Sequence, residues 1–151
     1  MHTFSVLGLI IGKMPLKYQA QLALCTKQPC PCPTKFQARP TTAFRFMNRA
    51  ATPMNFRPIA VIDGRTGPAP CEHYSLSFFR SVREAQQKYA LLAQREDAAS
   101  RYGDVIGRVD VLAVDGVISM PNSKGHMDLH ENEGVEFAPR VTEYHPVREE
   151  V

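Results

Sequence analysis

The stretch HYSLSFFRSVREAQQKYALLAQ, residues 73–94, constrains the fold more than any other part of this sequence. Its apolar and aromatic run at residues 74–79 is typical of a strand. Ser81 and Glu84 then form an S-x-x-E capping box, which predicts a helix with Ser81 as its N-cap. Apolar residues recur at helical spacing over the predicted helix 81–95, at Val82, Ala85, Tyr89, Leu92 and Ala93. The stretch therefore predicts a strand that leads directly into an amphipathic helix.

Strand-type patterns surround this joint. Alternating or β-branched runs bounded by turn residues predict strands at residues 42–47, 57–63, 105–114, 116–120, 125–130 and 135–147. Strands outnumber helices, and they do not alternate regularly with them. This pattern predicts an α+β fold with a mainly antiparallel twisted sheet and one principal helix.

The first 40 residues differ from the rest of the chain. The segment KQPCPCPTKFQARP, residues 27–40, alternates proline with polar residues, which is typical of extended or disordered chain. We therefore expect a flexible Pro-rich, basic segment over residues 1–40 and a single α+β domain over residues 41–151. The apolar run near the start, at residues 4–11, is too short to span a bilayer and follows no cationic segment. A soluble, cytoplasmic protein that does not bind membranes is the expectation.

Charge is divided unevenly along the chain. Residues 1–71 hold nine Lys and Arg residues and one acidic residue, whereas residues 72–151 hold nine Lys and Arg and fourteen acidic residues. Such a division is compatible with a basic half that binds nucleic acid, and equally with two halves that pack through complementary charges. The cations are scattered, and no named nucleic-acid-binding motif is present, so nucleic acid is a partner that we do not favour.

Four cysteines lie in the first half of the chain, at positions 25, 30, 32 and 71. Their C-x4-C-x-C spacing differs from the paired C-x2-C spacing of structural zinc sites, so free thiols are expected. Cys71 and His73 are two residues apart and can share a face, but nothing supplies the third group that would orient such a pair for catalysis.

Common catalytic and phosphate-binding motifs are absent: the sequence has no Walker A loop, no G-x-G-x-x-G, no G-x-S-x-G and no H-E-x-x-H. The densest group of potential metal ligands is GHMDLH, residues 125–130. On a strand, His126, Asp128 and His130 would share one face, where they could bind a transition metal or form a solvated polar surface.

The order of segments suggests one family. A strand with an arginine (FRF) precedes YSLSFF, the helix SVREAQQKYALLA, the strand IGRVDVLAV and the acidic stretch ENEGVEF. This order resembles the small ADP-ribosyltransferase-like domains of bacterial toxins and phage proteins. The resemblance implies that NAD is the substrate, and that Arg45, Tyr74, Ser75 and Ser77 bind it. It also implies that Glu136, or else Glu133, stabilises the oxocarbenium character of the transition state.

The sequence departs from that family at two places. YSLSFF lacks the S-T-S of some members, and ENEGVEF lacks a clear E-x-E before a strand, although Glu131 and Glu133 have the spacing. The alternative is a non-catalytic binding or inhibitor module that docks on a protein partner. The enzyme hypothesis predicts that Arg45, Ser75 and Glu136 converge in one cleft. The alternative predicts that they scatter, and that an apolar surface patch is exposed.

Overall fold

The computed structural model describes residues 15–25, 35–50, 52–95 and 97–149. Its α-helices are α2 (Gln19–Leu22), α4 (Ile59–Ile62), α5 (Val82–Ala93) and α6 (Ala98–Tyr102). Its strands are β1 (Thr41–Met47), β2 (Leu76–Phe79), β3 (Val105–Val111), β4 (Gly116–Ile118), β5 (His126–Glu131) and β6 (Glu143–Pro146). Short 3-10 turns lie at η1 (Pro53–Phe56), η2 (Cys71–Tyr74), η3 (Ala113–Asp115) and η4 (Ala138–Arg140).

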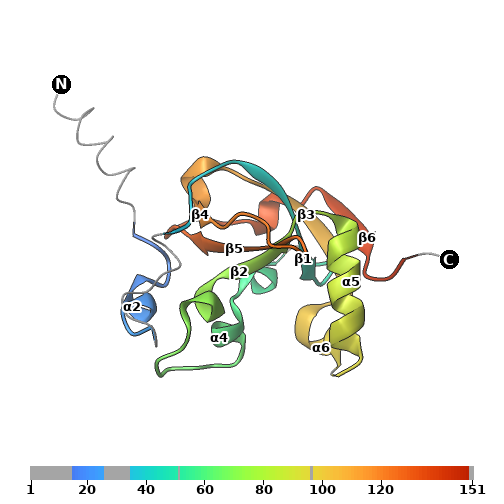
Figure 1. Ribbon diagram of the computed structural model, residues 1–151, viewed down its shortest axis with the longest axis horizontal. Helices are drawn as coiled ribbons and strands as arrows, with labels where there is room; N and C mark the ends of the chain where they lie inside the picture. The colour runs from blue at the N-terminus through green and yellow to red at the C-terminus, as the bar shows by residue number, and fades with distance from the viewer. Residues whose placement is uncertain (1–14, 26–34, 51, 96, 150–151) are drawn as a thin grey trace.

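The strands form one sheet in the order β4-β5-β2-β1-β3-β6, and every neighbouring pair is antiparallel. The principal helix, α5, packs at one side of this sheet, while α2 lies at the opposite end of the molecule (Figure 1). The α+β prediction and the mainly antiparallel sheet are thereby confirmed.

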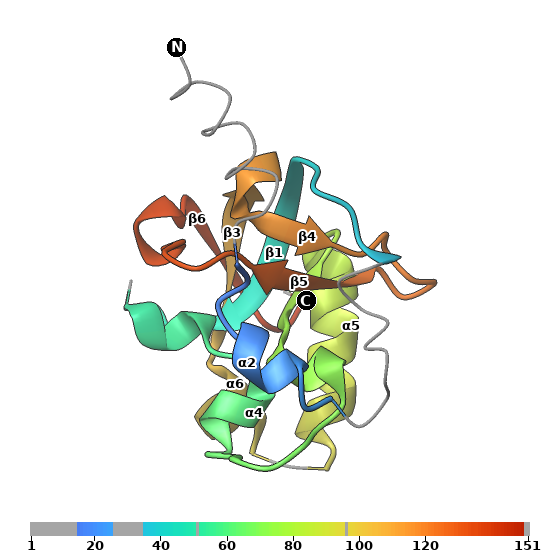
Figure 2. The same ribbon diagram turned by 90° about the vertical axis from the view of Figure 1, so that its left-hand side faces the viewer.

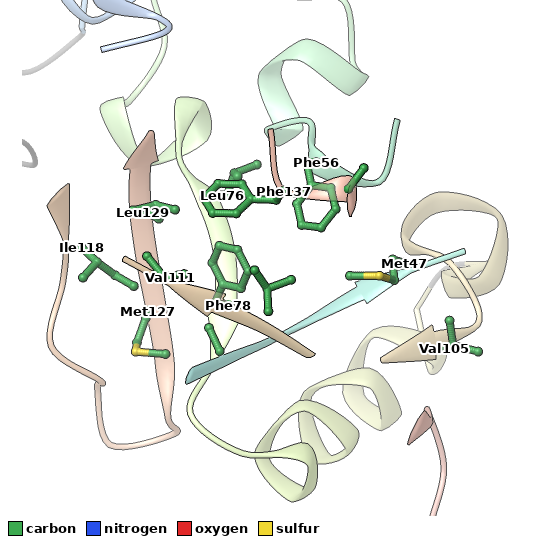
Figure 3. Packing of buried hydrophobic residues seen from close by; sticks show 13 residues of the cluster. Met47, Phe56, Leu76, Phe78, Val105, Val111, Ile118, Met127, Leu129 and Phe137 are labelled. Atoms are coloured by element: carbon green, nitrogen blue, oxygen red, sulfur yellow. The ribbon is translucent and has the colours of Figure 1, made fainter. Parts of the chain in front are cut away.

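The two faces of the sheet are covered differently. Side chains of β1, β2, β3, β4 and β5 that point to one face, among them Phe78 and Leu129, form the largest core cluster together with Phe137 beside η4 (Figure 3). On the other face, Phe79 and Ile106 pack with Ala85 of α5. Because side chains of a strand alternate between faces, each central strand contributes to both layers.

The helix α5 begins where the sequence predicts it. The Ser81 side chain accepts a hydrogen bond from the backbone N–H of Glu84, and the Ser81 hydroxyl donates to the Glu84 carboxylate at 2.8 Å. Ala85 and Tyr89 form the buried part of the predicted stripe, and the Tyr89 hydroxyl donates to the carbonyl of Gly103 at 3.0 Å. This bond joins α5 to the turn before β3.

One predicted strand is wrong, and another, at 135–147, is a strand only over β6, because η4 occupies part of its first half. The segment 57–63 contains α4, a single helical turn, in place of a strand. Pro58 sets the entry, and its carbonyl accepts hydrogen bonds from the N–H groups of Val61 and Ile62. Gly64, with φ of 65°, ends the turn in the left-handed region, where glycine is favoured. Proline before and glycine after this short apolar run outweigh its β propensity.

The described parts of residues 1–40 pack on the domain. Leu16 forms an isolated antiparallel bridge with Asn132, and Gln37 forms one with Ile118. Leu22 and Cys25 are buried together with residues of η2. The folded body therefore includes residues on the N-terminal side of the predicted boundary at 41. The predictions for residues 1–14 and 26–34 lie outside the described residues.

The expectation of free thiols does not hold for every described cysteine. Cys25 is buried, whereas Cys71 is disulfide-bonded. Cys71 therefore has no thiol to serve as a nucleophile beside His73. Cys30 and Cys32 lie outside the described residues.

Removing the Ser81 N-cap tests how much this residue stabilises the start of α5. Ser81→Ala leaves the N–H of Glu84 without its acceptor, so we expect the free energy of unfolding to fall by about 1 kcal/mol. Urea denaturation of the variant measures the change. Ser123→Ala, at an exposed loop serine, is the matched control. Equal losses in both variants would contradict the capping role.

Candidate functional site

A cleft of about 450 Å³ opens where β1 and β2 diverge. β1 pairs with β3 along its length and β2 pairs with β5, but β1 and β2 share one Cα pair, Phe44 with Phe79. Beyond this pair the two strands separate. We call the opening the β1–β2 cleft, and its volume lies within the range of about 300–1,000 Å³ that is typical of small-molecule sites.

Two helical walls flank the β1–β2 cleft. One wall is the segment from η1 to α4, and the other is formed by α5 and α6 (Figure 1). Asp63, just after α4, forms an ion pair with Arg101 of α6 at 3.2 Å. This pair connects the two walls.

Arg45 braces the point where the strands diverge. Its guanidinium donates hydrogen bonds to the backbone carbonyls of Asn55 (2.9 Å), Arg57 (3.0 Å) and Ser77 (2.9 Å). The group lies 6.0 Å from the ring centroids of both Phe56 and Phe78. Burial lowers the pKa of Arg45 to about 10, so the side chain stays charged at neutral pH.

The predicted NAD-binding residues divide into two groups. Arg45, Ser75 and Ser77 all line the β1–β2 cleft. The Ser75 hydroxyl lies 2.7 Å from the carbonyl of Glu72 and 2.9 Å from the carboxylate of Asp128, so it is held at the edge of the cleft. Tyr74 is absent from the cleft lining and packs on Tyr18, with ring centroids 5.9 Å apart.

The predicted catalytic carboxylates lie elsewhere. Glu133 and Glu136 are exposed to solvent and do not line the cleft. Among the described residues, the carboxylate in the lining belongs to Glu72 of η2. Glu131, at the end of β5, is buried, and its charge raises the pKa of Arg45 against the larger effect of burial. The expected convergence therefore holds for the arginine and the serines, but not for Glu136.

Cations outnumber acids in the lining of the cleft. Arg57, Lys88 and Arg101 join Arg45 there, against Glu72 alone among the described carboxylates. Aromatic surface is also present, from Phe46, Phe79 and Tyr102. Such a lining can bind an anionic ligand that carries a flat, apolar ring.

The three alternative metal ligands do share a face of β5, as predicted, but their side chains have separate surroundings. His126 lies 3.7 Å from the carboxylate of Asp128. Burial raises the pKa of Asp128, which His126 and Ser75 oppose. His130 is buried and stacks on Phe36, with ring centroids 5.6 Å apart. Within the described ranges, no group of three His, Cys, Asp or Glu residues is arranged to hold a metal ion.

Sequence reasoning missed much of the cleft. Arg57 was assigned to a strand, and the helix carrying Arg101 and Tyr102 was not predicted. One local signal was available for α6: Asp97 precedes it, and its side chain accepts a hydrogen bond from the N–H of Ser100, as at a capped helix N-terminus.

Comparison with protein-family models, with curated protein sequences and with solved structures finds no match to this chain. In the part of the chain that the structure describes, no helix has the length and apolar character needed to cross a membrane.

Replacing Arg45 with the shorter side chain of lysine is expected to destabilise the protein. A lysine cannot reach three carbonyls at once, so Arg45→Lys leaves buried acceptors unsatisfied and lowers the free energy of unfolding by about 2–4 kcal/mol. Chemical denaturation gives the value. The control is Arg83→Lys, because Arg83 is exposed and its contact with Glu149 is 3.9 Å long. A stability for Arg45→Lys within error of that control would exclude the bracing role.

Protonation of His130 is expected to destabilise the fold in acid. Burial lowers the pKa of His130 to about 4 from the ordinary 6.5. Between these values the unfolded chain takes up a proton that the folded protein does not, so stability falls as the pH drops from 6.5 toward 4. The loss attributable to this group is about 3 kcal/mol.

The variant His130→Phe keeps the aromatic stacking and removes the titration. Asp128 and Glu131 have raised pKa values in the folded protein, so their protonation increases the free energy of unfolding as the pH falls. This effect is opposite in sign to that of His130. Subtracting the variant's stability profile from that of the wild type isolates His130. A difference that does not change between pH 7 and pH 4 would refute the assignment.

Proposed function

We propose that the β1–β2 cleft binds NAD and that the protein is ADP-ribosyltransferase-like. One observation carries the proposal: Arg45 of β1, Ser77 of β2 and Ser75, which directly precedes β2, line a single cleft. The resemblance to ADP-ribosyltransferase-like domains had assigned these three residues to the dinucleotide. A non-catalytic docking module gives no reason for them to converge.

The charge of the cleft supports a dinucleotide ligand. A pyrophosphate carries negative charge that Arg57, Lys88 and Arg101 can neutralise from opposite walls. Arg45 uses three of its five N–H donors for backbone carbonyls, which leaves two for a ligand. The rings of Phe46 and Tyr102 offer surfaces for a base or for nicotinamide.

In this proposal Glu72 takes the role that the sequence assigned to Glu136 or Glu133. Cleavage of the nicotinamide–ribose bond develops positive charge on the ribose, and a carboxylate beside it lowers the barrier. All three carboxylates are exposed to solvent, but Glu72 lines the cleft, whereas Glu133 and Glu136 lie outside its lining. The departing electron pair goes to nicotinamide, and the ribose carbon then bonds to water or to an acceptor nucleophile.

Binding of NAD is tested by thermal denaturation and calorimetric titration. A ligand that binds the native state raises the melting temperature, so we expect a saturable increase with NAD. Arg57→Gln and Lys88→Gln should each weaken binding about tenfold, which corresponds to about 1.4 kcal/mol. Lys124→Gln, at an exposed lysine outside the cleft, is the matched control. Unchanged stability at millimolar NAD would contradict the proposal.

Measuring the rate of nicotinamide release distinguishes the catalytic roles of Glu72 and Glu136. We expect Glu72→Gln to lower the turnover number by about two orders of magnitude with little change in NAD affinity. Glu136→Gln should leave turnover unchanged. The opposite ranking would restore the sequence-based assignment. Binding without turnover would leave an NAD-binding protein and would remove the transferase activity.

A further inference from the structure

Residues 15–25, which we call the N-terminal strap, lie against the end of β5. The carbonyl of Pro15 accepts a hydrogen bond from the N–H of Glu133, and the N–H of Lys17 donates to the carbonyl of Glu131, both at 2.9 Å. After these contacts the strap forms α2, which contacts η2 (Figure 2). The strap is therefore held by a short length of backbone pairing and by side-chain packing.

The carboxylate of Glu131 lies beneath the strap. Its side chain is 2% exposed, and the ammonium nitrogen of Lys17 is 3.1 Å from Oε1. The contact is an ion pair at close range, and no other described residue donates a hydrogen bond to either carboxylate oxygen. Burial raises the pKa of Glu131, and Lys17, followed by Arg45, opposes that rise. A buried carboxylate is costly unless a cation accompanies it, so Lys17 is the main group that stabilises the charge of Glu131.

The ammonium of Lys17 reaches this carboxylate from the protein surface. Its side chain is 32% exposed, and the ammonium also donates to the carbonyl of Val135 at 3.2 Å. A carboxylate and a carbonyl thus face one cation at the mouth of a buried site. An ammonium or guanidinium group has N–H donors for both acceptors.

The charge of the Glu131 carboxylate interacts with a residue that lines the β1–β2 cleft. Burial raises the pKa of Tyr18 in the strap, the Glu131 carboxylate raises it further, and Arg57, which lines the cleft, lowers it. The same carboxylate acts on Arg45. The strap therefore covers an anionic group whose charge also acts on Arg45, a cation of the cleft.

We propose that Glu131 and the carbonyl of Val135 form a binding site for a primary ammonium or guanidinium cation, and that Lys17 occupies it as an internal ligand. A cationic side chain of a substrate or partner enters this site in competition with Lys17. The inference does not require that the cleft binds NAD.

Chemical rescue tests the site in the full chain. Lys17→Ala removes the cation and leaves room for a small amine. We expect this variant to melt at a lower temperature than the wild type, and about 100 mM n-butylammonium chloride to restore part of the loss in a saturable manner. The same concentration of n-butanol, which fills space without charge, should restore little.

The double variant Lys17→Ala with Glu131→Gln is the decisive control. It lacks the buried charge, so the amine should not stabilise it more than it stabilises the wild type. Equal amine effects in the single and double variants, or no effect in either, would overturn the proposal. If Lys17→Ala is recovered unfolded, return of its native circular dichroism in the amine buffer supports the site. Failure to refold where the wild type refolds overturns it. None of these outcomes depends on NAD binding.

Discussion

The guanidinium of Arg45 holds together the part of the sheet that would otherwise separate. Strands β1 and β2 meet at one residue pair, and the gap beyond it has no ladder of backbone hydrogen bonds. Arg45 replaces that ladder with three bonds to carbonyls on both sides of the gap. Because one side chain fixes both the η1 segment and β2, the shape of the cleft and the stability of the fold depend on the same interaction.

A buried cation that binds backbone carbonyls has an electrostatic consequence. The carbonyls stabilise the guanidinium but do not neutralise it, and among the described residues no carboxylate forms an ion pair with it. With Arg57 and Lys88 nearby, the cleft keeps a surplus of positive charge. Elsewhere, the basic and acidic halves of the chain meet through the ion pair of Lys17 with Glu131, and at the cleft wall Asp63 pairs with Arg101. Ion pairs thus neutralise part of the charge of the chain, and the cleft keeps a net positive charge.

Much of the framework could be predicted from local patterns. The cap at Ser81, the alternation in β1 and the apolar run of β2 all depend on neighbouring residues, and each element is where the pattern predicts it. The segment 57–63 failed because a proline and a glycine act on a run too short for periodicity to decide.

The candidate site was harder to predict because its members are distant in sequence. Arg45 and the serines could be nominated from the order of segments, but the separation of β1 from β2 depends on pairing that no local pattern encodes. The same limit applies to the carboxylates: Glu136 belongs to the acidic stretch that the resemblance points to, yet it lies outside the cleft, whereas Glu72 lines it. The role of Lys17 depends on a strap whose pairing with β5 spans more than 110 residues.

The most direct measurement is a nuclear magnetic resonance titration of the arginine side-chain N–H groups with NAD. If NAD binds in the cleft, the signals of Arg57 and Arg101, which line opposite walls, should shift, while the Arg45 Nε–H signal keeps the protection of a hydrogen-bonded group. Shifts confined to arginines outside the cleft, such as Arg83 or Arg148, or no shift at saturating NAD, would contradict it.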